Sequence, residues 1–171
     1  EYMTGDGFAS KLLVTPDGAV KNEYTDPTSG HTSIGDYDVM PIVDSFVAQH
    51  PDFAPYGYKG GIALTGYNGV LGYRSSPSVY QEKNPDLAAD IAAALKAEGW
   101  EFASHTWGHI TVSTSSLGRL QRDQMLWLSD VAPIVGPTDL LIYPFGADIA
   151  GVERYHGATF DFFQSQGYRY Y

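Results

Sequence analysis

The sequence predicts an α/β fold built as a partial or distorted (β/α) barrel with an inserted N-terminal β-hairpin. Short apolar runs bounded by glycine or proline alternate with helical patterns of roughly 10 to 15 residues, which is typical of βαβ units with parallel strands. About four core strands can be counted, whereas a closed α/β barrel needs about eight. A length of 171 residues with 43% hydrophobic content allows one domain with a sizeable core. We therefore expect residues 1–171 to form a single, incomplete domain in which residues 8–35 are the hairpin insertion.

The N-terminal part of the chain predicts this hairpin and one helix. Residues 8–24 alternate in hydropathy on either side of Pro16-Asp17-Gly18, which is typical of a hairpin with a short loop. The polar, glycine-rich residues 25–35 are expected to be a connection. Asp36 can cap a helix that ends near His50-Pro51, because apolar residues follow it at helical spacing. Those residues are Val39, Ile42, Val43, Phe46 and Val47.

The rest of the chain alternates predicted strands and helices. The uniformly apolar run 61–66 is typical of a strand that is buried on both faces. The next helix has Asn84 as its N-cap and Pro85 at its first position, and Gly99 ends it. Further strands are expected over residues 100–104, 139–143 and 168–171, and further helices over residues 117–132 and 151–165.

Composition excludes several classes of protein. The 10 basic and 20 acidic residues give a net charge of -10, which disfavours DNA or RNA as a partner. Cysteine is absent, so the chain has no disulfide, thiolate metal site or cysteine nucleophile, and a metal would have to bind histidine and carboxylate. The sequence shows neither a signal segment nor an apolar run of the length that a bilayer span requires.

Two histidines four residues apart, His105 and His109, directly follow an apolar, strand-like run. After a strand, side chains at positions i and i+4 can reach the same side, where two neutral nitrogens can bind one Zn²⁺-like ion. A metalloprotease helix carries glutamate directly after the first histidine as its general base, but Thr106 stands there, so a base must come from elsewhere. Two histidines that only cap a loop would show the same spacing, and this structural role stays open.

Two motifs, taken in order, resemble those of the NodB-homology polysaccharide deacetylases, also called carbohydrate esterase family 4. The family's His-Ser/Thr-x-x-His metal motif is similar to residues 105–109, His-Thr-Trp-Gly-His. Its Arg-x-Pro-Tyr/Phe-Gly motif is similar to the tail of residues 142–146, Ile-Tyr-Pro-Phe-Gly. The resemblance spans residues 36–171. It implies hydrolysis of N-acetyl or O-acetyl groups on a polysaccharide, with a divalent metal such as Zn²⁺ as the cofactor.

The resemblance also implies roles for individual residues. His105 and His109 would bind the metal, and the backbone N–H of Phe145 would stabilise the oxyanion that forms when water attacks the acetyl group. Residues near the same strand ends are candidates for contact with the glycan, with loop packing as the alternative role. These substrate-binding candidates are Trp107, Tyr67, Arg74 and Tyr143.

The sequence departs from the family pattern at several points. Family members carry a pair of aspartates on the first barrel strand, one as general base and one as third metal ligand, and that strand is expected upstream of Glu1. Ile142 occupies the position of the motif arginine, which removes the usual partner of the catalytic aspartate. The motifs that carry the general acid are expected beyond Tyr171. Asp148, shortly after the Phe145 turn, is the alternative for the third ligand within the chain.

Two classes of function therefore stay open. The first is a metal-dependent deacetylase, seen as part of a catalytic domain. The second is a non-catalytic carbohydrate-binding or cell-surface module that keeps the fold and uses some of its 13 tyrosines to stack on sugars. A different metallohydrolase on an α/β scaffold would need a further ligand within the chain. The resemblance implies a secreted or cell-surface location and an acetylated glycan as partner, and unpaired strand edges would favour self-association.

Overall fold

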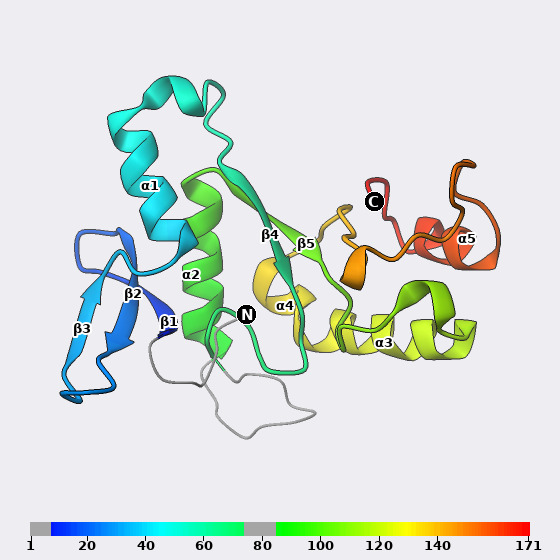
Figure 1. Ribbon diagram of the computed structural model, residues 1–171, viewed down its shortest axis with the longest axis horizontal. Helices are drawn as coiled ribbons and strands as arrows, with labels where there is room; N and C mark the ends of the chain where they lie inside the picture. Colours follow the sequence, from blue (N-terminus) through cyan, green and yellow to red (C-terminus); the bar gives the residue numbers. More distant parts are fainter. Residues whose placement is uncertain (1–7, 74–84) are drawn as a thin grey trace.

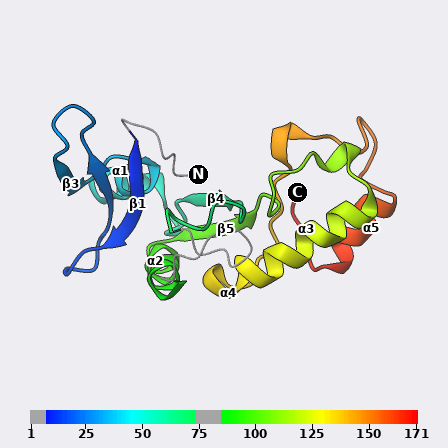
Figure 2. The ribbon, with the colours of Figure 1, turned by 90° about the horizontal axis from the view of Figure 1, so that it is seen from below.

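The computed structural model describes residues 8–73 and 85–171, which form a mixed α/β fold with two small sheets and five α-helices (Figure 1). An antiparallel sheet and helix α1 (Val39–Gln49) lie at one end of the elongated molecule. Helices α3 (Leu117–Asp130) and α5 (Ala158–Ser165) lie at the other end, on the far side of a central pair of parallel strands (Figure 2). The described strands do not close into a barrel.

The predicted hairpin is confirmed as strands β1 (Ala9–Val14) and β2 (Val20–Thr25), which pair antiparallel. Gly18 in the turn has a φ of +89°, a conformation that glycine adopts at little cost. A third strand, β3 (Thr32–Gly35), pairs with the other edge of β2. The expectation that residues 25–35 are only a connection was therefore wrong, because a short, polar strand carries almost no hydropathy signal of its own.

Helix α1 begins directly after Asp38, whose carboxylate accepts a hydrogen bond from the N–H of Val39 at 2.7 Å. The prediction that Asp36 is the cap was wrong. The Asp36 carboxylate instead contacts a lysine of β2 and a serine of α1, and so ties the helix to the sheet. The helix ends at Gln49, as predicted, and the short 3₁₀ turn Pro51–Phe53 follows it.

The central strands are β4 (Gly60–Leu64) and β5 (Trp100–Ser104), which pair in parallel with Leu64 opposite Ser104. Helix α2 (Pro85–Ala97) connects them, which confirms the predicted βαβ unit. The predicted N-cap of this helix, Asn84, lies outside the described residues. On the described chain, β4 has a strand partner on one edge only.

Beyond β5 the chain continues the parallel order through isolated bridges. Ser104 pairs with Leu141, and Leu140 pairs with Tyr170, both in parallel. The strands predicted over residues 139–143 and 168–171 are thus correctly placed, but each forms only single bridges. Consecutive chain segments therefore lie side by side in the order in which they occur in the sequence.

The later helices differ from the predictions at their ends. Helix α3 ends at Asp130, and a separate short helix, α4 (Ala132–Val135), follows where one helix over residues 117–132 was expected. The last helix, α5, begins at Ala158 rather than at residue 151. The residues before it form turns, and Gly157 has a φ of +86° that no α-helix accommodates.

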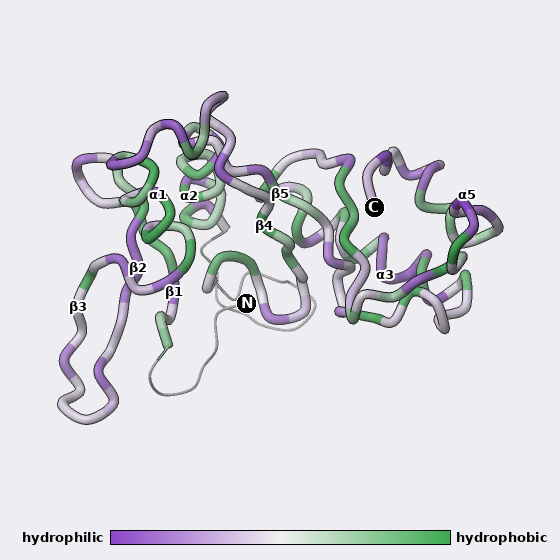
Figure 3. Tube along the Cα trace, turned by 45° about the horizontal axis from the view of Figure 1, so that its top comes forward, coloured by the Kyte–Doolittle hydropathy of each residue, from purple (hydrophilic) through white to green (hydrophobic). Residues whose placement is uncertain are grey.

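Buried side chains form two clusters. The first lies between the antiparallel sheet, α1, α2 and the parallel strands, and it also receives Trp127 from α3. The second lies between α3, α5 and the chain around Leu141. Hydrophobic stretches follow α1, α2 and the central strands along the trace in Figure 3. Among the residues described, no helix combines the length and the apolar character needed to cross a bilayer.

Candidate functional site

The two predicted metal ligands meet at the carboxyl end of β5. His105 is the first residue after the strand, and its N–H donates to the carbonyl of Leu64 at the end of β4. The loop then turns back, so that the imidazole centroids of His105 and His109 lie 4.8 Å apart with an interplanar angle of 64°. The spacing in sequence is thus matched by closeness in space, at the end of parallel strands where α/β proteins place their ligands.

The ring of His105 is held in one orientation by a backbone carbonyl. Its Nδ1 lies 2.7 Å from the carbonyl oxygen of Ile142, and because a carbonyl can only accept, Nδ1 carries the proton. The lone pair is then on Nε2, and a hydrogen bond of this kind is the usual support of a metal-binding histidine. Partial burial lowers the pKa of His105, against the opposing effect of the Ile142 carbonyl, so the neutral ring that a metal requires is favoured.

The Phe145 turn lies against the second of these histidines. Residues 144–146 form a short 3₁₀ turn, and the Phe145 ring packs edge-on against His109 with a centroid distance of 4.6 Å. The Phe145 side chain is 70% exposed, so burial of its ring is not what fixes the turn. The two motifs that the sequence analysis singled out, 37 residues or so apart, are therefore one structural unit.

Three residues of this unit have a left-handed backbone that side chains other than glycine rarely adopt. The φ values are +58° for Thr106, +51° for His109 and +63° for Phe145. Each costs about 1–2 kcal/mol, which the surrounding contacts must offset. One such contact is visible at Thr106, which is buried and whose hydroxyl accepts from the N–H of Ile110 at 3.0 Å. Strain of this kind gathers at functional sites more often than in ordinary loops.

Trp107 lies between the two histidines and is tied to its surroundings by both backbone and side chain. Its carbonyl accepts from the N–H groups of Gly66 and Tyr67 at 2.9 and 3.0 Å, and its indole N–H donates to Asp130 at 2.9 Å. The ring covers Gly66 so closely that a Cβ there would lie 2.1 Å from Trp107 Cδ1. Packing is the evident role of Trp107. Its contact with a glycan, and that of Tyr67 beside it, stay predictions.

The two other substrate-binding candidates lie elsewhere. Tyr143 is buried in an aromatic cluster with Tyr155, Phe163 and Tyr171, and burial raises the pKa of its hydroxyl. Tyr143 directly precedes the turn, and a contact between it and substrate stays a prediction. Arg74 lies outside the described residues.

No third metal ligand joins the histidines within residues 8–73 and 85–171, where no three His, Asp or Glu side chains are close enough to share an ion. Asp148, the candidate within the chain, closes a turn of its own. Its Oδ1 accepts from the N–H groups of Ala150 and Gly151, both at 2.9 Å, and these donors lower the pKa of its carboxyl. The donor set that the structure describes is therefore two imidazoles, those of His105 and His109, which fits part of a Zn²⁺ site.

Two buried carboxylates of α3 behind the histidine loop were not predicted. Asp123 accepts hydrogen bonds from the backbone of the loop, and Asp130 accepts one from the Trp107 indole. Burial raises the pKa of the Asp123 carboxyl, and its two backbone donors oppose that shift. The sequence holds a signal for both, since they fall on the same helical stripe as Leu120 and Trp127, where acidic residues are rare unless they have a partner.

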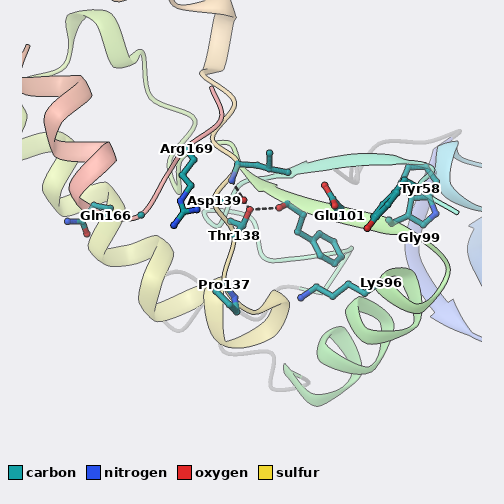
Figure 4. Close-up of a pocket in the computed structure, with 13 residues that line it drawn as sticks. Tyr58, Lys96, Gly99, Glu101, Pro137, Thr138, Asp139, Gln166 and Arg169 are labelled. Carbon is teal, nitrogen blue, oxygen red and sulfur yellow. Dashed lines mark hydrogen bonds between the residues drawn. The ribbon is translucent and has the colours of Figure 1, made fainter. Parts of the chain in front are cut away.

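A cavity of about 710 Å³ opens at the opposite, amino-terminal end of β5 (Figure 4). The hydroxyl of Thr138 in its wall donates to the carbonyl of Phe102 in β5 at 2.6 Å. Lys96 and Arg169 contribute cationic groups to the lining. No predicted site residue that the structure describes lines this cavity. The cavity and the histidine pair are thus separate features.

Comparisons of the chain with protein-family models, with curated proteins and with solved structures find no match.

Proposed function

We propose that this chain carries part of the catalytic site of a metal-dependent hydrolase that removes N-acetyl or O-acetyl groups from a polysaccharide. One observation carries the proposal. His105 and His109 face each other 4.8 Å apart at the end of parallel strands, with the Phe145 turn packed against the second ring. The sequence resemblance to the NodB-homology deacetylases rests on the same two segments, and their contact in space supports it.

The metal site would be built on the two imidazoles. His105 offers Nε2 because the Ile142 carbonyl fixes its other nitrogen, and His109 is adjacent. An ion of the Zn²⁺ type bound there would supply Lewis acidity, polarising an acetyl carbonyl and lowering the pKa of a bound water. Catalytic zinc sites usually have three protein ligands, so we propose that the third ligand and the general base are supplied from outside the described residues.

The remaining steps fall to the Phe145 turn and its neighbours. Pro144 has no N–H and a fixed φ, which leaves the N–H of Phe145 as the first backbone donor of the turn. A backbone N–H at such a place stabilises the negative charge that develops on the acetyl oxygen, and removal of one such donor typically costs about 10²–10³ in rate. The left-handed φ of Phe145 turns the chain away from a regular strand at this point.

The proposed architecture is part of a (β/α) barrel. Its support is the order of the parallel segments: β4, β5, the chain at residues 140–141 and the chain at residue 170 follow one another in sequence and in space. Barrels have this sequential order, whereas doubly wound sheets reverse direction at a switch point. A glycan substrate of this kind would place the parent protein outside the cell or at its surface.

A carbohydrate-binding module without catalysis is the second candidate. It is favoured by one specific observation: in the described part of the chain, no third His, Asp or Glu side chain is close enough to share an ion with the two histidines. The two candidates differ in what happens to an N-acetylglucosamine oligomer. The enzyme releases acetate in a metal-dependent manner, while the module binds the oligomer and releases none.

Titration of Zn²⁺ into the metal-free, 171-residue chain by calorimetry tests the proposed site. We expect His105→Ala to abolish binding and His156→Ala to leave it unchanged. His156 is a matched control because its Nδ1 also lies 2.7 Å from a backbone carbonyl, that of Arg154, but it is exposed and has no second imidazole. Equal losses from the two substitutions would refute the site. Tight one-to-one binding would show that the ligand set is complete within the chain, and weak binding would show that a ligand lies outside it.

A further inference from the structure

The loop between the two histidines is hydrogen-bonded to one buried carboxylate. Asp123, which is 8% exposed and lies on α3, accepts from the N–H of Trp107 through Oδ2 at 2.7 Å and from the N–H of Gly108 through Oδ1 at 2.8 Å. Hydrogen bonds from backbone N–H groups to an ionised carboxylate are about twice as strong as neutral ones. A single side chain thereby fixes both peptide units at the centre of the segment between the histidines.

The same segment is also held by residues that lie just after β4. The Trp107 carbonyl accepts the N–H groups of Gly66 and Tyr67, which follow that strand. The N–H groups of Trp107 and Gly108 therefore bond to α3, while the Trp107 carbonyl bonds to the residues that follow β4. With Trp107 and Gly108 held in this way, the left-handed residues that flank them, Thr106 and His109, have no freedom to relax.

We infer that Asp123 is a positioning residue that sets the separation of the two metal-binding imidazoles by clamping the backbone between them. This inference rests on the proposed function, because the distance matters only if both rings bind one ion. Loss of one of the two hydrogen bonds to Asp123 would let the segment relax toward ordinary backbone angles. His109 would then move relative to His105, whose ring is fixed by Ile142.

Asp130 provides a matched control on the same helix. It is also buried, with 5% exposure, and its carboxylate accepts from Trp107, but from the indole N–H rather than from the backbone. Asp123→Asn and Asp130→Asn each replace a buried carboxylate by an amide of the same shape. Both are expected to lower the thermal midpoint, and only the first disturbs the backbone between the histidines.

The experiment measures metal affinity and metal geometry together in the folded chain. Co²⁺ replaces Zn²⁺ as a spectroscopic probe, because its visible absorption reports coordination geometry, and Zn²⁺ affinity is measured by calorimetry. We expect Asp123→Asn to weaken Zn²⁺ binding by about 10- to 100-fold, the usual effect of replacing a residue that orients a metal ligand. The Co²⁺ spectrum should change as well. Asp130→Asn should retain both the wild-type affinity and the wild-type spectrum.

Gly108→Ala tests the same clamp without removing a buried charge. A Cβ at Gly108 would lie 3.0 Å from Asp123 Oδ1 and 3.4 Å from Ile110 Cγ2, so it should loosen the grip while α3 stays intact. Gly108→Ala is expected to shift the Zn²⁺ affinity and the Co²⁺ spectrum in the same direction as Asp123→Asn does. If Asp123→Asn does not fold, Gly108→Ala still tests the inference. Wild-type affinity and spectrum in a folded Asp123 or Gly108 variant would overturn the inference, as would equal losses in Asp130→Asn. Unchanged binding in His105→Ala would instead refute the proposed function.

Discussion

Replacement of Gly99 by alanine is expected to destabilise the protein by about 3 kcal/mol or more, through two separate costs. Gly99 ends α2 and leads into β5, with a φ of +96° that L side chains rarely adopt. A Cβ there would lie 1.7 Å from the carbonyl oxygen of Gly57 and 2.8 Å from its carbonyl carbon. Both neighbours are backbone atoms, so the chain itself would have to move, and the hydrogen bond from the Lys59 N–H to the Gly99 carbonyl would be strained.

Gly167→Ala separates the two costs. Gly167 follows α5 as Gly99 follows α2, and its φ of +98° is nearly the same, but a Cβ there would meet nothing within 4 Å. It should lose only the conformational part, about 1–2 kcal/mol. Urea unfolding of the two variants beside the wild type gives both values. Equal losses would mean that the close approach to Gly57 contributes nothing to stability.

The sequence predicted best those elements whose signals are local. The β1–β2 hairpin has its turn residues at Pro16-Asp17-Gly18, and the end of α2 has Gly99. Both were placed correctly because turn chemistry and capping depend on a few adjacent residues. The strands at residues 139–143 and 168–171 were placed correctly, but their predicted lengths were too great. The length of a strand depends on partners elsewhere in the chain.

Elements set by distant contacts were missed. Strand β3 exists because β2 offers a free edge, and its own residues, Thr-Ser-Ile-Gly, show little alternation. The start of the last helix was placed too early because the polar stretch before Gly157 contains helix-compatible residues. In the structure, Asp148 draws the N–H groups of Ala150 and Gly151 into a turn instead.

The candidate site shows the same division. The spacing of His105 and His109 and the Pro-Phe-Gly turn were readable from the sequence as two separate motifs, and their contact confirms that both belong to one place in the fold. The clamp by Asp123 was not predicted, because nothing in the sequence pairs residue 123 with the N–H groups of residues 107 and 108. An acidic residue on the apolar stripe of a helix is a signal that its carboxylate has a hydrogen-bond partner.

The second large effect concerns a partly buried ionic cluster of Asp44 in α1, Lys59 just before β4 and Glu98 just after α2. Lys59 Nζ lies 2.5 Å from Asp44 Oδ1 and 3.9 Å from Glu98 Oε2, and the Trp100 indole N–H donates to Asp44 at 2.9 Å. Asp44 Oδ2 and Glu98 Oε2 are buried, with no hydrogen-bond partner as long as both groups are ionised. One lysine thus faces two carboxylates, and the excess negative charge is relieved when one carboxylate takes up a proton.

That proton is expected on Glu98. Burial, followed by the neighbouring Asp44, raises the pKa of Glu98 from its ordinary value of 4.5 to about 7. Between these two values the folded protein retains a proton that the unfolded chain has released. Stability from this group is therefore greatest at low pH and falls as the pH rises through the folded pKa of about 7. Allowing for screening by water at this partly exposed side chain, we expect a loss of about 1 kcal/mol between about pH 5 and about pH 8.

Glu98→Gln should remove this pH dependence, because the amide can donate to Asp44 as the protonated acid does and never carries a charge. The variant is expected to be more stable than the wild type at about pH 8 and nearly equal to it at about pH 5, measured as free energy of unfolding in urea. Glu101→Gln, which neutralises an exposed glutamate three residues further on, is the matched control and should leave the slope unchanged. If the unfolding free energy of Glu98→Gln still falls with pH as in the wild type, the proton belongs to another group. If the pH dependence is lost in both variants, net charge and not the cluster sets it.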